Sequence, residues 1–159
     1  MNNKGFTVVE LIAAFSITMV ISVFLFELLI EVKDIFIETS LKTSIEEKTA
    51  IISKNIYNLF NDTSNVVTCS NNTTCTVNGD NISVVHNEDK KEKDYIIIKE
   101  QKFSTPKDGD NYIKIDNSSI NLSTNSELGN EGYLIVSFDL TSDNLSIPYK
   151  YNTVFYYTR

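Results

Sequence analysis

Residues 6–30 read FTVVELIAAFSITMVISVFLFELLI, and this stretch decides the architecture of the chain. It is longer than the roughly 20 apolar residues that an α-helix needs to cross the hydrocarbon core of a bilayer. Lys4 precedes the stretch, and acidic residues predominate just beyond it. Because basic residues are preferentially retained on the cytoplasmic side, we expect a transmembrane helix with its amino terminus in the cytoplasm. The remainder of the chain would then be exported.

The apolar stretch carries a carboxylate, Glu10, near its cytoplasmic end. A charged side chain at the centre of a spanning helix costs roughly 2.5–3.5 kcal/mol on insertion scales, so Glu10 needs a partner of opposite charge. A secretory signal peptide would have a shorter apolar core of roughly 7–15 residues, followed by small residues at a cleavage site. Such a site does not follow residue 30, and we expect the stretch to be kept as an anchor.

Residues 4–12 read KGFTVVELI. This segment resembles the processing motif of type IV pilins and of the related pseudopilins of type II secretion and DNA-uptake machines. The resemblance implies that a prepilin peptidase cleaves after Gly5 and that the new terminal residue, Phe6, is N-methylated. It also implies that Glu10 is an assembly residue, which pairs with the terminal amine of a neighbouring subunit as helices pack in a filament.

Simple electrostatics agrees with that implied role for Glu10. Cleavage would convert the neutral backbone amide of Phe6 into an ammonium, and N-methylation would keep the charge. Two opposite charges attract strongly where the dielectric constant is low, and removing one leaves the other uncompensated. The alternative is an uncleaved single-span anchor that carries an extracytoplasmic binding module.

Beyond the membrane, the helix is expected to continue to residue 62. Neither Gly nor Pro occurs between Phe6 and Asn78, so no helix breaker ends it at the membrane surface. Apolar residues recur there at helical spacing, which predicts one face packed on a globular domain. These residues are Ile37, Leu41, Ile45, Ile52, Ile56 and Phe60.

After residue 62 the pattern becomes typical of β-strands. Turn-forming residues occur at 78–80, 106–110 and 129–132. Short strands are predicted at 66–68, 82–86, 95–99, 112–115, 133–140 and 153–157. The predicted fold class is therefore α+β, with a long amino-terminal helix packed on a mainly antiparallel sheet. The predicted segments are a leader (1–5), a transmembrane helix (6–30), the extracytoplasmic part of the helix (31–62) and a β-rich domain (63–159).

The two cysteines, Cys69 and Cys75, lie in the polar part of the chain, which contains a single histidine, His86. A zinc site with four Cys and His ligands cannot be assembled from these residues within one chain. We expect a disulfide, which requires an oxidising compartment. Because the loop that it closes is short, the disulfide should stabilise the fold by only about 2 kcal/mol. Free thiols remain the alternative, with metal binding a smaller one.

Composition and motifs favour a structural protein. Lys and Arg number 14 against 21 Asp and Glu, a net charge of -7, so direct nucleic-acid binding is not expected. The sequence carries no motif for a nucleophile, a phosphate-binding loop or a metal site, so we expect no catalytic residue, cofactor or metal. His86 is expected to be an ordinary strand residue and the charged stretch 88–94 a solvated loop.

The aromatic stretch 149–157 is expected to form a final core strand, with a contact surface for another subunit or a ligand as the alternative. The family resemblance implies three partners besides the membrane: a prepilin peptidase, other pilin or pseudopilin subunits, and an inner-membrane assembly platform with its ATPase. It favours a minor subunit, because Glu27 stands where major pilins usually have a helix-breaking proline. The succession of a long helix, a polar β-domain and an aromatic final strand is similar to that of J-type minor pseudopilins and the related minor pilins. The expected location is the cytoplasmic membrane and then a pilus or pseudopilus at the cell surface.

Overall fold

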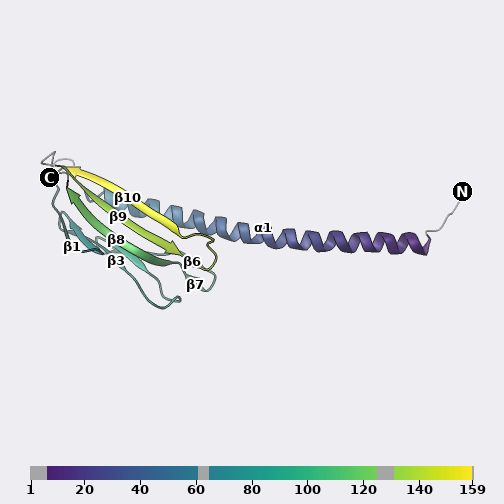
Figure 1. Ribbon diagram of the computed structural model, residues 1–159. Helices are drawn as coiled ribbons and strands as arrows, with labels where there is room; N and C mark the ends of the chain where they lie inside the picture. Colours follow the sequence, from purple (N-terminus) through teal and green to yellow (C-terminus); the bar gives the residue numbers. More distant parts are fainter. Residues whose placement is uncertain (1–6, 61–64, 125–130, 159) are drawn as a thin grey trace. The chain divides into compact units, whose positions relative to one another are not determined.

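The computed structural model describes residues 7–60, 65–124 and 131–158. Within them, one long apolar helix, α1 (Val8–Tyr57), is followed by antiparallel β-strands (Figure 1). The predicted α+β class, with the helix ahead of an antiparallel sheet, is confirmed at this level. The chain divides into two compact units, Met1–Ile37 and Glu38–Arg159, so α1 contributes residues to both.

The first unit consists of the amino-terminal part of α1. Its large apolar side chains are exposed, from Val8 to Phe36. Exposing a side chain of this size to water rather than burying it is unfavourable by roughly 1.5–3 kcal/mol, so this segment requires apolar surroundings. Its length and composition are sufficient to cross a membrane, which makes α1 compatible with a single-pass anchor.

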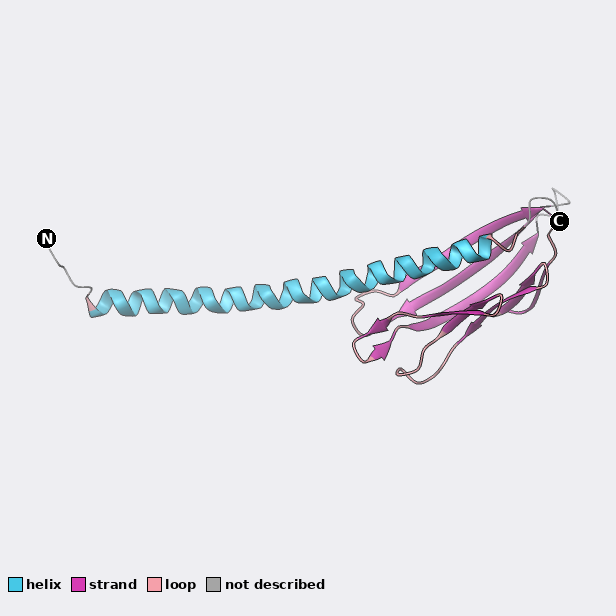
Figure 2. Ribbon diagram, turned by 180° about the vertical axis from the view of Figure 1, so that it is seen from behind, coloured by secondary structure: helices cyan, strands magenta, loops and turns pink. Residues whose placement is uncertain are grey.

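The carboxyl-terminal part of α1 belongs to the second unit and buries one face. The buried positions are Leu41, Ile45, Thr49, Ile52 and Ile56, spaced by three or four residues. The predicted stripe is therefore confirmed at four of its six residues, while Ile37 and Phe60, at its ends, are half-buried. Figure 2 shows this part of α1 lying along the long strands of the unit.

The helix ends at Tyr57, so the predicted continuation to residue 62 is wrong as far as Phe60; residues 61 and 62 lie outside the described residues. The last turn tightens, because the N–H groups of Leu59 and Phe60 donate to carbonyls three residues earlier. The carbonyl of Leu59 then accepts a hydrogen bond of 2.8 Å from the side-chain amide of Asn78. A residue far along the chain thus caps the helix end.

The strands form three antiparallel sheets within the described residues. A five-stranded sheet has the order β1-β2-β3-β4-β5, a three-stranded sheet the order β10-β9-β8, and β6 pairs only with β7. The strands are β1 (Val67–Asn71), β2 (Thr74–Val77), β3 (Asp80–Val85), β4 (Tyr95–Ile98), β5 (Gln101–Ser104), β6 (Lys107–Asp108), β7 (Asn111–Tyr112), β8 (Lys114–Thr124), β9 (Glu131–Thr141) and β10 (Tyr149–Thr158).

Each predicted strand overlaps at least one of these strands, but β2, β5, β6 and most of β8 were not predicted. The missed segments are short or rich in Asn, Ser and Thr, so they lack the apolar alternation typical of strands. The predicted turn at 78–80 is confirmed: Asn78 and Gly79 have φ angles of 54° and 90°, as a two-residue hairpin turn requires. The predicted turn at 106–110 contains β6, and Gly132 of the third predicted turn lies in β9.

Aromatic side chains join β9 and β10 to α1 and to the residues that directly follow it. Phe138 and Tyr151 stack with ring centroids 4.5 Å apart, and the Tyr151 hydroxyl lies 2.6 Å from Ser53 Oγ on the helix. Phe60 stacks on Tyr157 at 5.5 Å. The aromatic carboxyl-terminal stretch therefore forms a strand with one face buried in the core, as predicted.

Candidate functional site

The first candidate site is the first turn of α1, where Glu10 forms a capping box with Thr7. The Thr7 backbone N–H donates to Glu10 Oε2 at 2.9 Å, and the Thr7 hydroxyl donates to the same oxygen at 3.0 Å. In return, the Glu10 N–H donates to Thr7 Oγ1 at 3.3 Å. Both residues are exposed, so the Glu10 carboxylate stays accessible to another molecule.

The capping box of Thr7 and Glu10 can be recognised in the sequence, but the prediction for Glu10 did not use this signal. A Thr followed three residues later by Glu, directly before an apolar run, is typical of a helix start. Glu10 therefore has a local role in helix initiation besides any role between molecules. The predicted processing residues, Gly5 and Phe6, lie outside the described residues.

Cys69 and Cys75 form a disulfide in the second unit. They are register partners on β1 and β2, so the bond crosses a hairpin whose tip contains Asn72 and Thr73. Cys75 is fully buried. The disulfide and Glu10 belong to different units of the chain.

The second candidate site is a polar cluster around Asp94, which is fully buried. The prediction that 88–94 is a solvated loop is therefore wrong at its last residue. The Asp94 carboxylate accepts hydrogen bonds from the N–H groups of Ile115 at 2.7 Å and Asn87 at 2.8 Å. Lys114 Nζ donates to it at 3.2 Å, and His86 Nδ1 lies 3.1 Å away.

The Asp94 cluster joins the loop after β3 to the start of β8. Lys114 also donates to the carbonyls of Asn87 and Glu92, so its ammonium is enclosed by three acceptors. Its side chain is only 12% exposed. His86 lies one residue beyond β3 and contacts a buried charge, so the expectation of an ordinary strand residue is corrected.

Burial acts to raise the pKa of the Asp94 carboxyl. This effect is outweighed by hydrogen bonds from the N–H groups of Ile115 and Asn87 and from the side chains of Lys114 and His86. The net result is a pKa held below the ordinary value of 3.8. Asp94 is therefore ionised at neutral pH.

This lowered pKa predicts an acid-dependent loss of stability. Because the folded-state pKa lies below the unfolded value, the contribution of Asp94 is fully present above about pH 4 and is lost as pH falls through the folded-state pKa. The measurement is urea unfolding of the full chain in detergent, at about pH 7 and about pH 3, beside Asp94→Asn. The stability difference between the two proteins should shrink at the lower pH; a difference that is unchanged would contradict the assignment.

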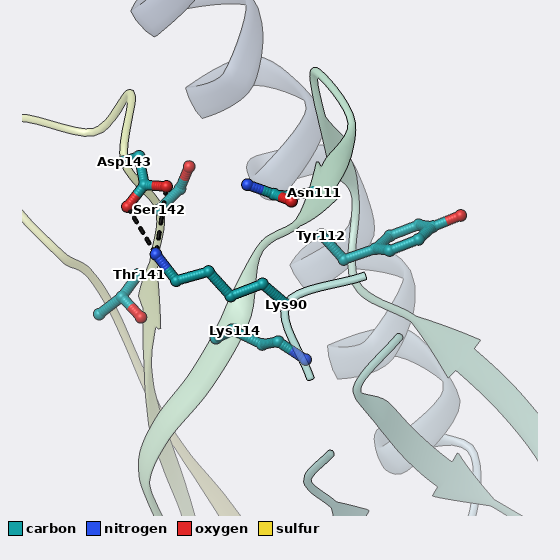
Figure 3. Close-up of a pocket in the computed structure, with 7 residues that line it drawn as sticks. All are labelled: Lys90, Asn111, Tyr112, Lys114, Thr141, Ser142 and Asp143. Carbon is teal, nitrogen blue, oxygen red and sulfur yellow. Dashed lines mark hydrogen bonds and ion pairs between the residues drawn. The ribbon is translucent and has the colours of Figure 1, made fainter. Parts of the chain in front are cut away.

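A small polar cleft of about 150 Å³ borders the Asp94 cluster (Figure 3). Lys90 and Asp143 face each other across it, with Nζ and Oδ1 3.0 Å apart. Both side chains are largely exposed, and such pairs contribute about 0–1 kcal/mol. The cleft is lined by Lys90, Asn111, Tyr112, Lys114, Thr141, Ser142 and Asp143. Its charged groups are already paired, so it offers a ligand little beyond weak polar contacts.

Among the described residues, no group of three or more His, Cys, Asp or Glu side chains is placed to hold a metal ion. The structure thus defines a chain with one apolar amino-terminal helix, compatible with a membrane anchor, and an antiparallel β-rich unit. Comparison with family models, curated proteins and solved structures finds no match for this chain.

Proposed function

We propose that the chain is a pilin-like structural subunit of a type IV pilus, a type II secretion pseudopilus or a competence pseudopilus. The observation that carries the proposal is the first part of α1, an exposed apolar helix with an accessible carboxylate, Glu10, in its first turn. The segment KGFTVVEL around it supports processing after Gly5. Position 27, where major pilins usually have a helix-breaking proline, is Glu27 in this chain, which favours a minor subunit.

In the proposed mechanism, hydrolysis of the bond between Gly5 and Phe6 frees an ammonium on Phe6, and N-methylation by a methyl donor in a separate step keeps this charge. Glu10 then exchanges its capping contact for the ammonium of a neighbouring subunit. The exchange gives up a capping contact of about 1 kcal/mol and avoids leaving a buried ammonium without its partner, which costs about 3–5 kcal/mol. Thr7 holds the carboxylate in place until the neighbouring subunit arrives.

The remaining parts of the chain fit the same role. The exposed apolar side chains of the first unit would contact lipid before assembly and neighbouring helices afterwards. An assembly platform and its ATPase would supply the work of extraction from the membrane. The β-rich unit would face outwards, where its disulfide is stable in an oxidising compartment.

The test is intact-mass and amino-terminal analysis of membrane-extracted protein, produced with and without a prepilin peptidase. We expect a chain that begins at methylated Phe6 only when the peptidase is present. Gly5→Ala is the matched variant, because it should remain uncleaved. A chain that begins at Met1 in both samples would overturn the proposal and leave a single-span anchored binding module.

A further inference from the structure

The turn between β2 and β3 contains Asn78 and Gly79, the one place in the sequence where glycine directly follows asparagine. Both residues are exposed, and their φ angles of 54° and 90° form the two-residue turn of the hairpin. Asparagine is a thermally labile residue, because its side-chain amide can be lost as ammonia. The turn therefore combines a labile side chain with access to water.

The residue that follows an asparagine determines how readily the amide is lost. The loss begins when the backbone nitrogen of that residue attacks the asparagine Cγ, and a Cβ on the same residue crowds the approach. Gly79 has no Cβ, and no described atom outside its two chain neighbours lies within 4 Å of the position that a Cβ would take. The backbone nitrogen of Gly79 is therefore an unhindered nucleophile for Cγ of Asn78.

The side-chain amide of Asn78 joins separate segments of the second unit. Its Nδ2 donates to the carbonyl of Leu59, which directly follows the helix, at 2.8 Å, and to Oδ1 of Asn65 at 3.0 Å. Its Oδ1 accepts from the N–H of Val66 at 2.9 Å. Leu59 and Asn65 are both buried. The amide thus directs its N–H groups to two protein acceptors, and a group that only accepts hydrogen bonds cannot replace it there.

Loss of the amide requires only water as a co-reactant. The Gly79 nitrogen gives its proton to a base from the solvent and attacks Cγ of Asn78, so that a new C–N bond forms. The bond between Cγ and Nδ2 then breaks, and ammonia leaves with a proton from the solvent. Water opens the resulting succinimide ring at either carbonyl, which gives aspartate or isoaspartate. The net change exchanges ammonia for water and transfers no electrons.

Either product removes the donor that Asn78 supplies to the helix end. A carboxylate only accepts hydrogen bonds, so it would face the Leu59 carbonyl and Asn65 Oδ1 with no hydrogen between them. Aspartate would keep the contact with Val66, because that contact needs only an acceptor. Isoaspartate adds a carbon to the backbone, which does not fit a two-residue hairpin turn. The contact between the turn and the helix end is therefore the one that the reaction breaks.

We propose that Asn78 is a deamidation site, and that its conversion loosens the helix end from the β2–β3 turn. The change is slow and irreversible, so it accumulates with the age of the folded protein. Ring closure requires the Asn78 side chain to leave its partners and fold back on Gly79, so opening of these contacts limits the rate. This inference concerns the second unit and does not depend on processing at Gly5 or on filament assembly.

The first test compares two turns of the same sheet in one protein. The β1–β2 turn carries an exposed asparagine, Asn72, which is followed by Thr73 and provides the matched site. The full-length chain in detergent is kept in mildly alkaline buffer, sampled over time and digested, and tandem mass spectrometry follows both asparagines. We expect Asn78 to convert at least about tenfold faster than Asn72, because the branched side chain of Thr73 hinders the same attack.

The second test measures the consequence in Asn78→Asp, with Asn72→Asp as the control. Both variants add a negative charge to an exposed turn, but Asn78 is the residue that donates to the helix end. We expect the amides of Leu59 and Phe60 to exchange with solvent deuterium at least about tenfold faster in Asn78→Asp and at an unchanged rate in Asn72→Asp. The Val66 amide should stay protected in both variants.

The aged parent protein links the two tests. Protein in which Asn78 has converted to aspartate, separated by its added charge, should show the exchange pattern of Asn78→Asp. Equal conversion of Asn78 and Asn72 would overturn the assignment of a deamidation site. Exchange at Leu59 and Phe60 that is the same in both variants would overturn the loosening of the helix end. Faster exchange throughout β2 and β3 in Asn78→Asp would also overturn it, in favour of a general loss of the hairpin.

Discussion

Replacing Asp94 with alanine is expected to lower the unfolding free energy of the second unit by about 3–5 kcal/mol. The substitution leaves the N–H groups of Ile115 and Asn87 without their acceptor. It also leaves the ammonium of Lys114, only 12% exposed, without its carboxylate partner. The contact with Ile115 is fully buried, so water does not replace the missing acceptor there, and the contacts with Asn87 and Lys114 are partly buried.

The measurement is urea unfolding of the full-length chain in detergent at about pH 7, monitored by circular dichroism of the β-rich unit. Asp143→Ala is the matched control, because Asp143 also pairs with a lysine, Lys90, but is largely exposed. We expect the control to change the unfolding free energy by less than about 1 kcal/mol. Equal effects of the two substitutions would show that Asp94 is not the central acceptor of the cluster.

Replacing Glu10 with alanine is expected to reduce incorporation into filaments roughly 100-fold or more, if the proposed function holds. The substitution would leave the ammonium of a neighbouring Phe6 without its partner in the filament core, and breaking a buried ion pair costs about 3–5 kcal/mol. The measurement is the amount of subunit in sheared filaments relative to the membrane. Amino-terminal mass must show that processing is intact in the same cells.

Two controls separate the roles of Glu10. Glu27→Ala removes another exposed carboxylate of α1 and should leave incorporation unchanged. Thr7→Ala removes the hydroxyl of the capping box, at about 1 kcal/mol, while it keeps the Glu10 carboxylate and the contact of that carboxylate with the Thr7 backbone N–H. A defect in Thr7→Ala as large as that in Glu10→Ala would mean that helix capping, rather than pairing between subunits, explains the loss.

The helix was predictable from sequence because its signals are local. The apolar run of residues 6–30 and the recurrence of Leu41, Ile45, Ile52 and Ile56 depend only on spacing within the segment. The capping box of Thr7 and Glu10 is equally local, and its spacing was present in the sequence. The end of α1 was placed too late, because the residue that caps Leu59 is Asn78, on the β2–β3 turn.

The Asp94 cluster was missed for a different reason. Asp94 ends a run of charged residues, and such a run is typical of a solvated loop. Its partner Ile115 is 21 residues away in sequence, and the two meet only when β8 is in place. β8 itself is rich in Asn and Ser, and it forms a strand because it pairs with β9 rather than because of its own composition.

The sequence by itself determined the apolar helix, the position of its carboxylate and the antiparallel character of the rest, since each follows from the order of neighbouring residues. Only the tertiary structure decided that Asp94 is buried and that β10 is the end strand of its sheet among the described residues. These features depend on which strands pair. Strand pairing joins residues far apart in the chain through backbone groups that every residue carries. Local composition therefore does not specify which strands pair.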